Sequence, residues 1–385
     1  MRALTLAGIT ATLTGFTSSA AVVLAGLRAM GATPTQAASG LVAACVLQAI
    51  AMLWATRRTR IPLMIVWSTP GMALLASASA PQGGFPAAVG AFLVTGALIV
   101  LTGFWPLLAR LVTSIPTPIA QAMLAGVLVQ LCLKPVAGAI ADPAVILPLV
   151  VVWLALMRFA PTWASTAAFA AGLVALGVEA IAGDGVDGRI LPALEFVAPT
   201  LDGGAIVGIA LPLYVVTMAS QNLPGTAILA SYGYRAPWRF TMGLTGVGSM
   251  VSALFGGGTL NMGALTTAMV ASPDAHPDPA ERWKGVRVMG IGYGVMAVFA
   301  TALMALSDVD PAVLAAVAGL ALIPTLASSL TAAVSDTAHR LPAVVTFLVG
   351  ASGVTILGIG AAFWALLVGL VAYAVLRPRA PAAGR

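Results

Sequence analysis

The chain has 385 residues, of which 60% are hydrophobic and 8% are charged, and its formal net charge is +6. Ordinary soluble domains are about 45–50% apolar and about 25% charged, so this composition excludes a soluble globular protein. A membrane-spanning helix takes about 20 residues, which leaves room for about 10 to 14 spans and for no soluble catalytic or nucleic-acid-binding domain of ordinary size.

Apolar stretches bounded by charges, proline or glycine predict about fourteen spans, with the polar segment 183–202 between two halves of seven. In the first half the stretches centre near Phe16, Val46, Gly71, Val94, Gly126, Val150 and Ala170. In the second half they centre near Leu213, Val247, Leu265, Val295, Gly319, Phe347 and Leu367.

The positive charges fit this count when the N-terminus is placed in the cytoplasm. Only Arg28, Lys134 and Arg189 then lie outside, which leaves 15 of the 18 lysine and arginine residues on the cytoplasmic side. Because cytoplasmic loops are enriched in these residues, the pattern predicts a multi-pass protein of the bacterial inner (cytoplasmic) membrane with both termini in the cytoplasm. Seven is an odd number, so the two halves enter the membrane from opposite sides and can be inverted repeats.

Two predicted spans, the third and the tenth, are interrupted at matching places. The run 61–67 is short and β-rich, and Ser68, Thr69 and Pro70 then give a helix-start signal. In the tenth span three glycines, 256–258, precede Thr259 and Asn261 as possible caps. We therefore expect two half-helices that begin at mid-membrane, each after an extended piece, and we expect those pieces to be buried by pairing with each other. The alternative is that proline and the glycines only kink or pack continuous helices.

Two half-helices of this kind would point their N-termini toward each other. Each helix start carries about half a positive charge and unpaired N–H groups, so the pair can hold a carboxylate without a buried lysine or arginine. No predicted span centre contains such a residue.

The end of the eighth span carries the amides Gln221 and Asn222, which are costly to bury unless they bind something. The alternative is a helix end, with Gly225 as its C-cap and the amides in water. In the first span, Thr17 and Ser18 could line the same cavity, although such hydroxyls often bond only to their own helix.

Four motifs carry a resemblance to a known family: Trp67–Gly71, Met218–Gly225, Ala275–Pro279 and Thr346–Val354. With them the chain resembles the benzoate membrane transport protein (BenE) family, which is similar to transporters of the uracil permease and sulfate permease fold. The resemblance implies an all-α polytopic membrane protein of fourteen spans in two inverted seven-span repeats. It also implies uptake of benzoate or a similar aromatic acid driven by protons, and a possible homodimer.

The same resemblance implies a division into two moving parts. A core domain would comprise residues 1–110 (spans 1 to 4) and 203–308 (spans 8 to 11). A gate domain would comprise residues 111–182 (spans 5 to 7) and 309–377 (spans 12 to 14). Residues 183–202 would form an extracytoplasmic loop between the repeats, and residues 378–385 a cytoplasmic tail.

The expected substrate site lies between the two half-helix starts, with the eighth span alongside. We expect the substrate carboxylate to be held by backbone N–H groups and oriented by two amide side chains. The backbone donors are Gly71, Met72, Gly258, Thr259 and Leu260, and the orienting amides are Gln221 and Asn222. The full set of candidate binding residues is Thr17, Ser18, Ser68, Thr69, Gly71, Met72, Met218, Gln221, Asn222, Gly257, Gly258, Thr259, Leu260 and Asn261.

Other functions fit the sequence less well. A channel would need a continuous polar pore lining, and an intramembrane enzyme would need His, Asp, Cys or a metal at depth. We predict no catalytic residue, metal, cofactor or nucleic-acid partner, only substrate, protons and membrane lipid. A carrier for another small anion or a nucleobase-like substrate stays open. The proton carrier is not evident, since Asp336 and His339 are either titrating groups at the cytoplasmic exit or solvated loop residues.

Overall fold

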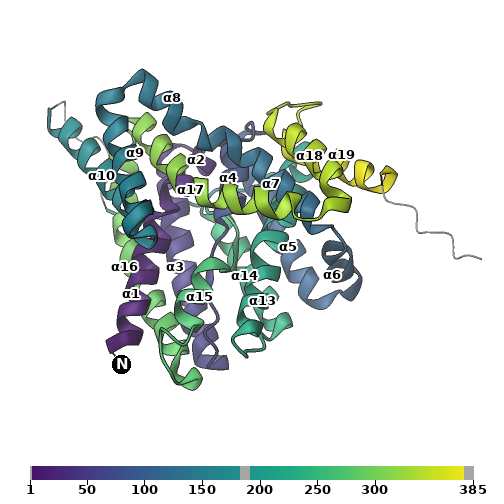
Figure 1. Cartoon of the computed structure of the whole chain (residues 1–385), viewed down its shortest axis with the longest axis horizontal. Helices are drawn as coiled ribbons and strands as arrows, with labels where there is room; N and C mark the ends of the chain where they lie inside the picture. Colours follow the sequence, from purple (N-terminus) through teal and green to yellow (C-terminus); the bar gives the residue numbers. More distant parts are fainter. Residues whose placement is uncertain (1, 183–190, 377–385) are drawn as a thin grey trace, which may run out of the picture.

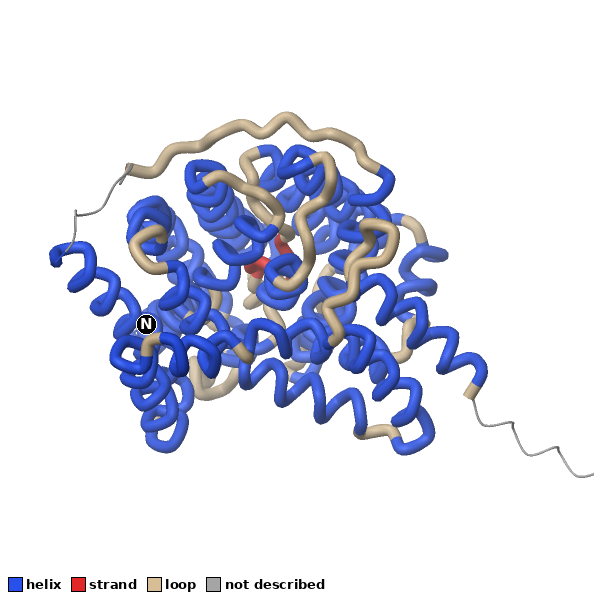
Figure 2. The backbone as a smooth tube through the Cα atoms, turned by 90° about the horizontal axis from the view of Figure 1, so that it is seen from above, coloured by secondary structure: helices blue, strands red, loops and turns tan. Residues whose placement is uncertain are grey.

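The computed structural model of the chain describes residues 2–182 and 191–376, and these are almost entirely helical (Figure 1). The predicted loop 183–202 lies partly, and the predicted tail 378–385 wholly, outside the described residues. A single two-stranded sheet is present in the described part, and it lies in the interior among the helices (Figure 2).

The first half of the chain contains ten helices and one strand among its described residues. Their bounds are α1 Arg2–Thr17, α2 Ala20–Ala29, α3 Pro34–Thr59, β1 Ile65–Trp67, α4 Thr69–Ala76, α5 Gly84–Phe104, α6 Pro106–Thr113, α7 Thr117–Cys132, α8 Lys134–Ala141, α9 Pro143–Phe159 and α10 Pro161–Ala182.

The second half begins with a helical stretch that alternates between α- and π-helix and continues with further α-helices and one strand. Its elements are α11 Gly203–Ala205, the π-helix η1 Ile206–Ala210, α12 Leu211–Thr217, the π-helix η2 Met218–Asn222, α13 Leu223–Ser231, α14 Trp238–Leu254, β2 Leu260–Met262, α15 Leu265–Ala271, α16 Trp283–Ser307, α17 Pro311–Val334, α18 Arg340–Ala351 and α19 Ala361–Val375, with short 3-10 turns η3 Pro279–Glu281 and η4 Thr337–His339.

Eight helical stretches of the described chain are long and apolar enough to cross a membrane, and two shorter helices, Pro143–Phe159 and Ala361–Val375, are also apolar. The expectation of a helical polytopic membrane protein is therefore confirmed. The finer count of fourteen spans in two inverted repeats stays a prediction.

The two extended pieces pair with each other, as expected. β1 and β2 are antiparallel, with Ile65 opposite Met262, Val66 opposite Asn261 and Trp67 opposite Leu260. Two further backbone bonds lengthen the ladder, from Ser68 N to the Thr259 oxygen (2.9 Å) and from Gly263 N to the Met64 oxygen (3.1 Å). The pairing satisfies the backbone groups of extended segments that are buried among the helices.

The start of α4 follows the prediction, and the start of α15 does not. Ser68 is the N-cap of α4, and its Oγ accepts a hydrogen bond from Gly71 N at 3.1 Å. Thr259 and Asn261, by contrast, do not cap a helix. Asn261 belongs to β2, and α15 begins only at Leu265, after Ala264, which makes no side-chain cap. The ladder with β1 keeps residues 260–262 extended and so delays the helix.

The segment that leads into the second half crosses the outside of the helices and is bonded to three of their ends. It is the long loop that continues from the grey trace after α10 in Figure 2. Ser39 Oγ accepts from Glu195 N at 2.8 Å, Val197 N donates to the Leu254 oxygen at 2.8 Å, and Thr200 N donates to the Pro86 oxygen at 3.0 Å. Residues 195–200 are thus fixed to α3, α5 and α14.

Candidate functional site

The two-stranded sheet is fixed at its edges by side chains from three helices. Trp67 N donates to Gln48 Oε1 of α3 at 3.1 Å, and Leu260 N donates to Ser249 Oγ of α14 at 2.8 Å. Met262 N donates to Asn222 Oδ1 of η2 at 2.9 Å. Strand edges in an apolar interior need such partners, because each unpaired N–H group is costly.

A buried cluster of hydroxyl groups joins α4, α12 and the residue before β2. Thr217 Oγ1 donates to Ser68 Oγ at 3.2 Å and lies 3.4 Å from Thr259 Oγ1. All three side chains are fully buried. The structure therefore brings the predicted residues Ser68 and Thr259 together, through a threonine that the sequence reasoning missed.

Gln221 and Asn222 both contact the second half-helix or its strand. Asn222 is buried, with Oδ1 on Met262 N and Nδ2 donating to Met218 Sδ at 3.2 Å. Gln221 is half-buried, and its Oε1 accepts from Ala264 N at 3.3 Å, directly before α15. The alternative of a helix end at Gly225 is wrong, because α13 continues to Ser231. Met218–Asn222 is a π-helix, an irregularity that is frequent at functional sites.

Three of the backbone groups expected to bind substrate already have partners. Gly71 N donates to Ser68 Oγ, and Met72 N donates to the Ser68 backbone oxygen at 2.8 Å. Leu260 N is used by Ser249. In this structure these N–H groups are therefore not free, contrary to expectation, because the helix cap and the sheet edge take them.

The other candidates divide into two groups. Gly257 and Gly258 are buried where a Cβ would collide with Ser252 Oγ and Met72 Sδ, so they allow the chain before β2 to approach α14 and α4 closely. Thr17 and Ser18 do not join the Ser68 cluster. Thr17 Oγ1 donates to the Leu13 oxygen at 2.7 Å and to Thr166 Oγ1 of α10 at 2.9 Å, and Ser18 Oγ donates to the Gly15 oxygen.

The first span reaches the sheet through a different residue, Ser19. Its Oγ accepts from Trp67 Nε1 at 2.8 Å, and the Trp67 ring packs edge-on against Tyr293 with centroids 5.5 Å apart. Gln48, Thr217 and Ser249 were also missed. Each of them is an uncharged polar side chain within a predominantly apolar helix.

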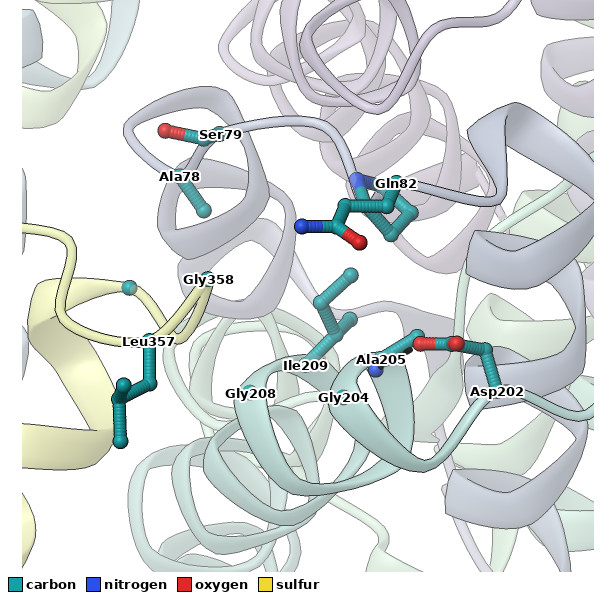
Figure 3. Close-up of a pocket in the computed structure, with 12 residues that line it drawn as sticks. Ala78, Ser79, Gln82, Asp202, Gly204, Ala205, Gly208, Ile209, Leu357 and Gly358 are labelled. Atoms are coloured by element: carbon teal, nitrogen blue, oxygen red, sulfur yellow. Dashed lines mark hydrogen bonds between the residues drawn. The ribbon is translucent and has the colours of Figure 1, made fainter.

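Two cavities lie beyond the ends of the half-helices. One, of about 190 Å³, follows the C-terminal end of α4 and is lined by Ser79, Gln82, Asp202, Ile209 and Leu357, with the Gln82 amide directed into it (Figure 3). The other, of about 550 Å³, lies beside α15 and is lined by Leu6, Thr10, Thr162, Tyr232 and Met269, among others. The hydroxyl cluster lines neither of these two cavities, and its three side chains are fully buried in this structure.

The site has no formal charge. The segments 61–76, 206–231 and 254–271 contain no Asp, Glu, His, Lys or Arg. Within the described residues no three His, Cys, Asp or Glu side chains are grouped to hold a metal ion. Asp336 and His339 form a pair at 2.6 Å in the exposed turn between α17 and α18, where the His339 ring holds the pKa of the Asp336 carboxyl group below its usual value. They line neither cavity, which favours the interpretation as loop residues.

Comparison with known proteins agrees with the helical membrane fold. The family model of the benzoate membrane transport protein, BenE, matches residues 2–375. The inner membrane protein YdcO of Escherichia coli is 38% identical over 96% of this chain and 95% of the relative. The benzoate membrane transport protein of Acinetobacter baylyi is 30% identical over 86% of this chain and 84% of the relative.

Two solved structures share the fold at low sequence identity. The transmembrane domain of the cyanobacterial bicarbonate transporter BicA has a TM-score of 0.63 at 17% identity and covers 91% of this chain and 97% of the other. SLC26A9 has a TM-score of 0.68 at 12% identity and covers 96% of this chain and 65% of the other. The match over nearly the whole chain, together with the paired half-helices, shows that this protein is a membrane transporter and belongs to the BenE benzoate membrane transport protein family.

Proposed function

We propose that this chain is a secondary active transporter that imports benzoate or a similar aromatic carboxylate across the bacterial inner membrane, coupled to protons. The observation that carries the proposal is the buried, uncharged polar cluster at the start of α4, beside the strand that leads into α15. Helix starts and broken spans at membrane depth are where secondary transporters bind their substrates. The name of the Acinetobacter baylyi relative supports the choice of substrate.

The sheet register supports two inverted seven-span repeats. An offset of 195 residues carries 65, 66 and 67 onto 260, 261 and 262, and the strand pairs of the sheet are then images of one another. The same offset carries the end of α3 at Thr59 onto the end of α14 at Leu254. It carries the start of α4 at Thr69 to within one residue of the start of α15 at Leu265. Repeats of this kind suit a carrier that opens alternately to the two sides.

In this proposal a core domain, residues 1–110 and 203–308, moves against a gate domain, residues 111–182 and 309–377. The two cavities are the two entrances, and the bond between Thr17 and Thr166 lies at the boundary between the domains. Both termini and the tail 378–385 are cytoplasmic, the loop 183–202 is extracytoplasmic, and two copies form a homodimer.

The substrate lies against the face of the sheet that carries Ser68 and Thr259, and its ring contacts the buried side chains of Met72 and Met218. Gln221 contacts its carboxyl group, since this amide is half-buried and joins the start of α15. Thr69, also half-buried, lies at the edge of the same site. A channel is not favoured, because the cluster is fully buried and no charged lining runs through the spans.

Counterflow tests this function and separates it from the other carriers of the fold. Purified full-length protein is reconstituted into liposomes loaded with unlabelled benzoate, and entry of labelled benzoate is followed against protein-free liposomes. We expect exchange above the protein-free background that excess benzoate suppresses and that uracil and bicarbonate do not. If uracil or bicarbonate suppresses the exchange instead, the substrate is a nucleobase or an inorganic anion and the proposal is wrong.

A further inference from the structure

One buried acceptor beside the proposed site has no partner. Asn261 stands at the centre of the sheet, opposite Val66, and is fully buried. Its Nδ2 donates to the Met262 oxygen at 2.8 Å, whereas its Oδ1 bonds to no group of the described residues. A buried polar atom without a hydrogen bond is rare in native proteins and requires a reason, such as a bound ligand.

The alternation of the strands places this side chain on the substrate face of the sheet. Residues two apart along a strand share a face, so Asn261 lies with Thr259, and Val66 with Ser68. Ser68 and Thr259 bond to Thr217, which fixes this face as the one turned toward the eighth span. Val66 on this face is half-buried, while its neighbours Ile65 and Trp67 are buried.

Among the residues that the structure describes, no charged side chain is placed to hold a carboxylate or to exchange a proton there. The elements packed against the sheet carry Arg57 and Arg58 at the end of α3 and Arg239 at the start of α14, and all three are exposed. The remaining titratable groups nearby are weak acids, the buried Cys45 of α3, Tyr214 of α12, and Tyr293 beside Trp67.

The available hydrogen-bonding groups match a carboxylic acid better than a carboxylate. An ionised carboxylate only accepts hydrogen bonds, so it would place an acceptor beside the unpaired Asn261 Oδ1, and the N–H groups of Gly71 and Met72 are already taken. A protonated acid has one O–H donor and one C=O acceptor. Burial away from cations also favours the neutral form of any carboxyl group.

We infer that the substrate binds as the undissociated acid, with its O–H donating to Asn261 Oδ1 and its C=O accepting from the Gln221 amide. This inference rests on the proposed function and deepens it. Each acid molecule then enters with its own proton and ionises in the cytoplasm to one carboxylate and one proton. Symport consequently needs no titrating side chain in the protein.

Binding to the purified full-length protein in detergent tests the inference, since it avoids diffusion of the neutral acid through a bilayer. The probes are benzoate, benzamide, which is neutral and donates N–H, and benzenesulfonate, which is an anion at every pH used. Carboxylic acids ionise near pH 4, so the neutral fraction falls about tenfold for each pH unit above that. We expect the apparent Kd of total benzoate to rise about tenfold per unit from pH 5 to pH 7, benzamide to bind equally at each pH, and benzenesulfonate not to bind.

A Kd for benzoate that does not change over this pH range, or tight binding of benzenesulfonate, would overturn the inference while leaving an aromatic anion carrier in place. Binding of none of the three probes would instead reject the proposed substrate class, and the inference with it.

A pair of variants adds a test at the residue. Asn261→Leu removes the acceptor and keeps the branched shape of the side chain, and we expect benzamide and benzoate to bind about tenfold or more weakly, the effect of losing a hydrogen bond to a buried group. Thr301→Val removes another buried, unpaired polar atom, in α16 away from the sheet, and should leave binding unchanged. Wild-type affinity in a folded Asn261→Leu protein would contradict the assignment. If Asn261→Leu does not fold, the pH dependence of benzoate binding and the benzenesulfonate result for the wild-type protein test the inference without it.

Discussion

Ser68 uses one hydroxyl group for two purposes. Its oxygen accepts from Gly71 N, which caps α4, and from Thr217 Oγ1, which ties the helix start to the eighth span. An N-cap of this kind stabilises a helix by about 0.5–2 kcal/mol. The cap could be predicted from the order serine, threonine, proline. Its link to Thr217 could not, because a threonine in an apolar helix most often bonds to its own backbone.

Gln221 gives the sharpest test at the scale of a residue. Replacing it with alanine removes one hydrogen bond to the substrate, worth about 0.5–1.5 kcal/mol, so we expect the KM for benzoate to rise roughly 2- to 10-fold. The bond to Ala264 N is lost as well, so we expect a small drop in the thermal unfolding midpoint. The neighbouring Ser220→Ala is the matched control, since the Ser220 hydroxyl donates to the Val216 oxygen of its own helical stretch. Unchanged kinetics in Gln221→Ala, measured by benzoate counterflow, would remove Gln221 from the site.

The second half-helix shows how far the bounds of an element could be predicted from the sequence. Three glycines predicted a break before α15, and the break is present. Its length was misjudged because the extended conformation of residues 260–262 depends on β1, which lies far away in the sequence. Gln48 and Ser249 were also missed, because their partners are backbone groups of the two strands, whose extended conformation was not predicted residue by residue.

Arg282 holds the other end of α15. It is buried, and its guanidinium donates to the oxygens of Ala271 (2.8 Å), His276 (2.7 Å) and Pro277 (3.3 Å). Ala271 is the last residue of α15, and a positive charge at this end of a helix also interacts favourably with the helix dipole. This contact fixes the half-helix and the loop that follows it to the start of α16.

Arg282→Ala should therefore lower the thermal unfolding midpoint and the rate of uptake together. Hydrogen bonds to charged groups contribute about 1.5–3 kcal/mol, and here three are lost. The exposed Arg287, which stacks on Trp283, is the matched control, and Arg287→Ala should cost no more than about 0.5–1 kcal/mol. Equal midpoints for the two variants in a thermal unfolding assay would show that Arg282 does not anchor α15.

At the scale of the whole molecule, transport requires the proposed core and gate domains to move against each other. α1 and α10 meet at the boundary, where the Thr17 and Thr166 hydroxyl oxygens are 2.9 Å apart. The order of serine, proline and glycine residues along the chain predicted the two interruptions, while the count of fourteen spans stays a prediction. The sequence could not place Thr17 against α10, because helix contacts between separate parts of the chain leave no local pattern.

A cross-link across this boundary should stop transport. With Cys45 and Cys132 replaced, the double variant Thr17→Cys, Thr166→Cys brings two thiols close enough for a disulfide or a short bifunctional reagent. We expect oxidation to abolish benzoate uptake and reduction to restore it, while each single cysteine variant is insensitive to oxidant. Full uptake by the cross-linked protein would show that α1 and α10 do not separate during transport.

The central claim, proton-coupled uptake of an aromatic acid, is tested most directly in proteoliposomes. The initial rate of labelled benzoate uptake is measured with the lumen alkaline relative to the outside and again at equal pH, with protein-free liposomes subtracted in both cases. We predict a protein-dependent rate that rises when the gradient is imposed and falls back when a protonophore collapses it. A protein-dependent rate that is the same with and without the gradient would contradict proton coupling.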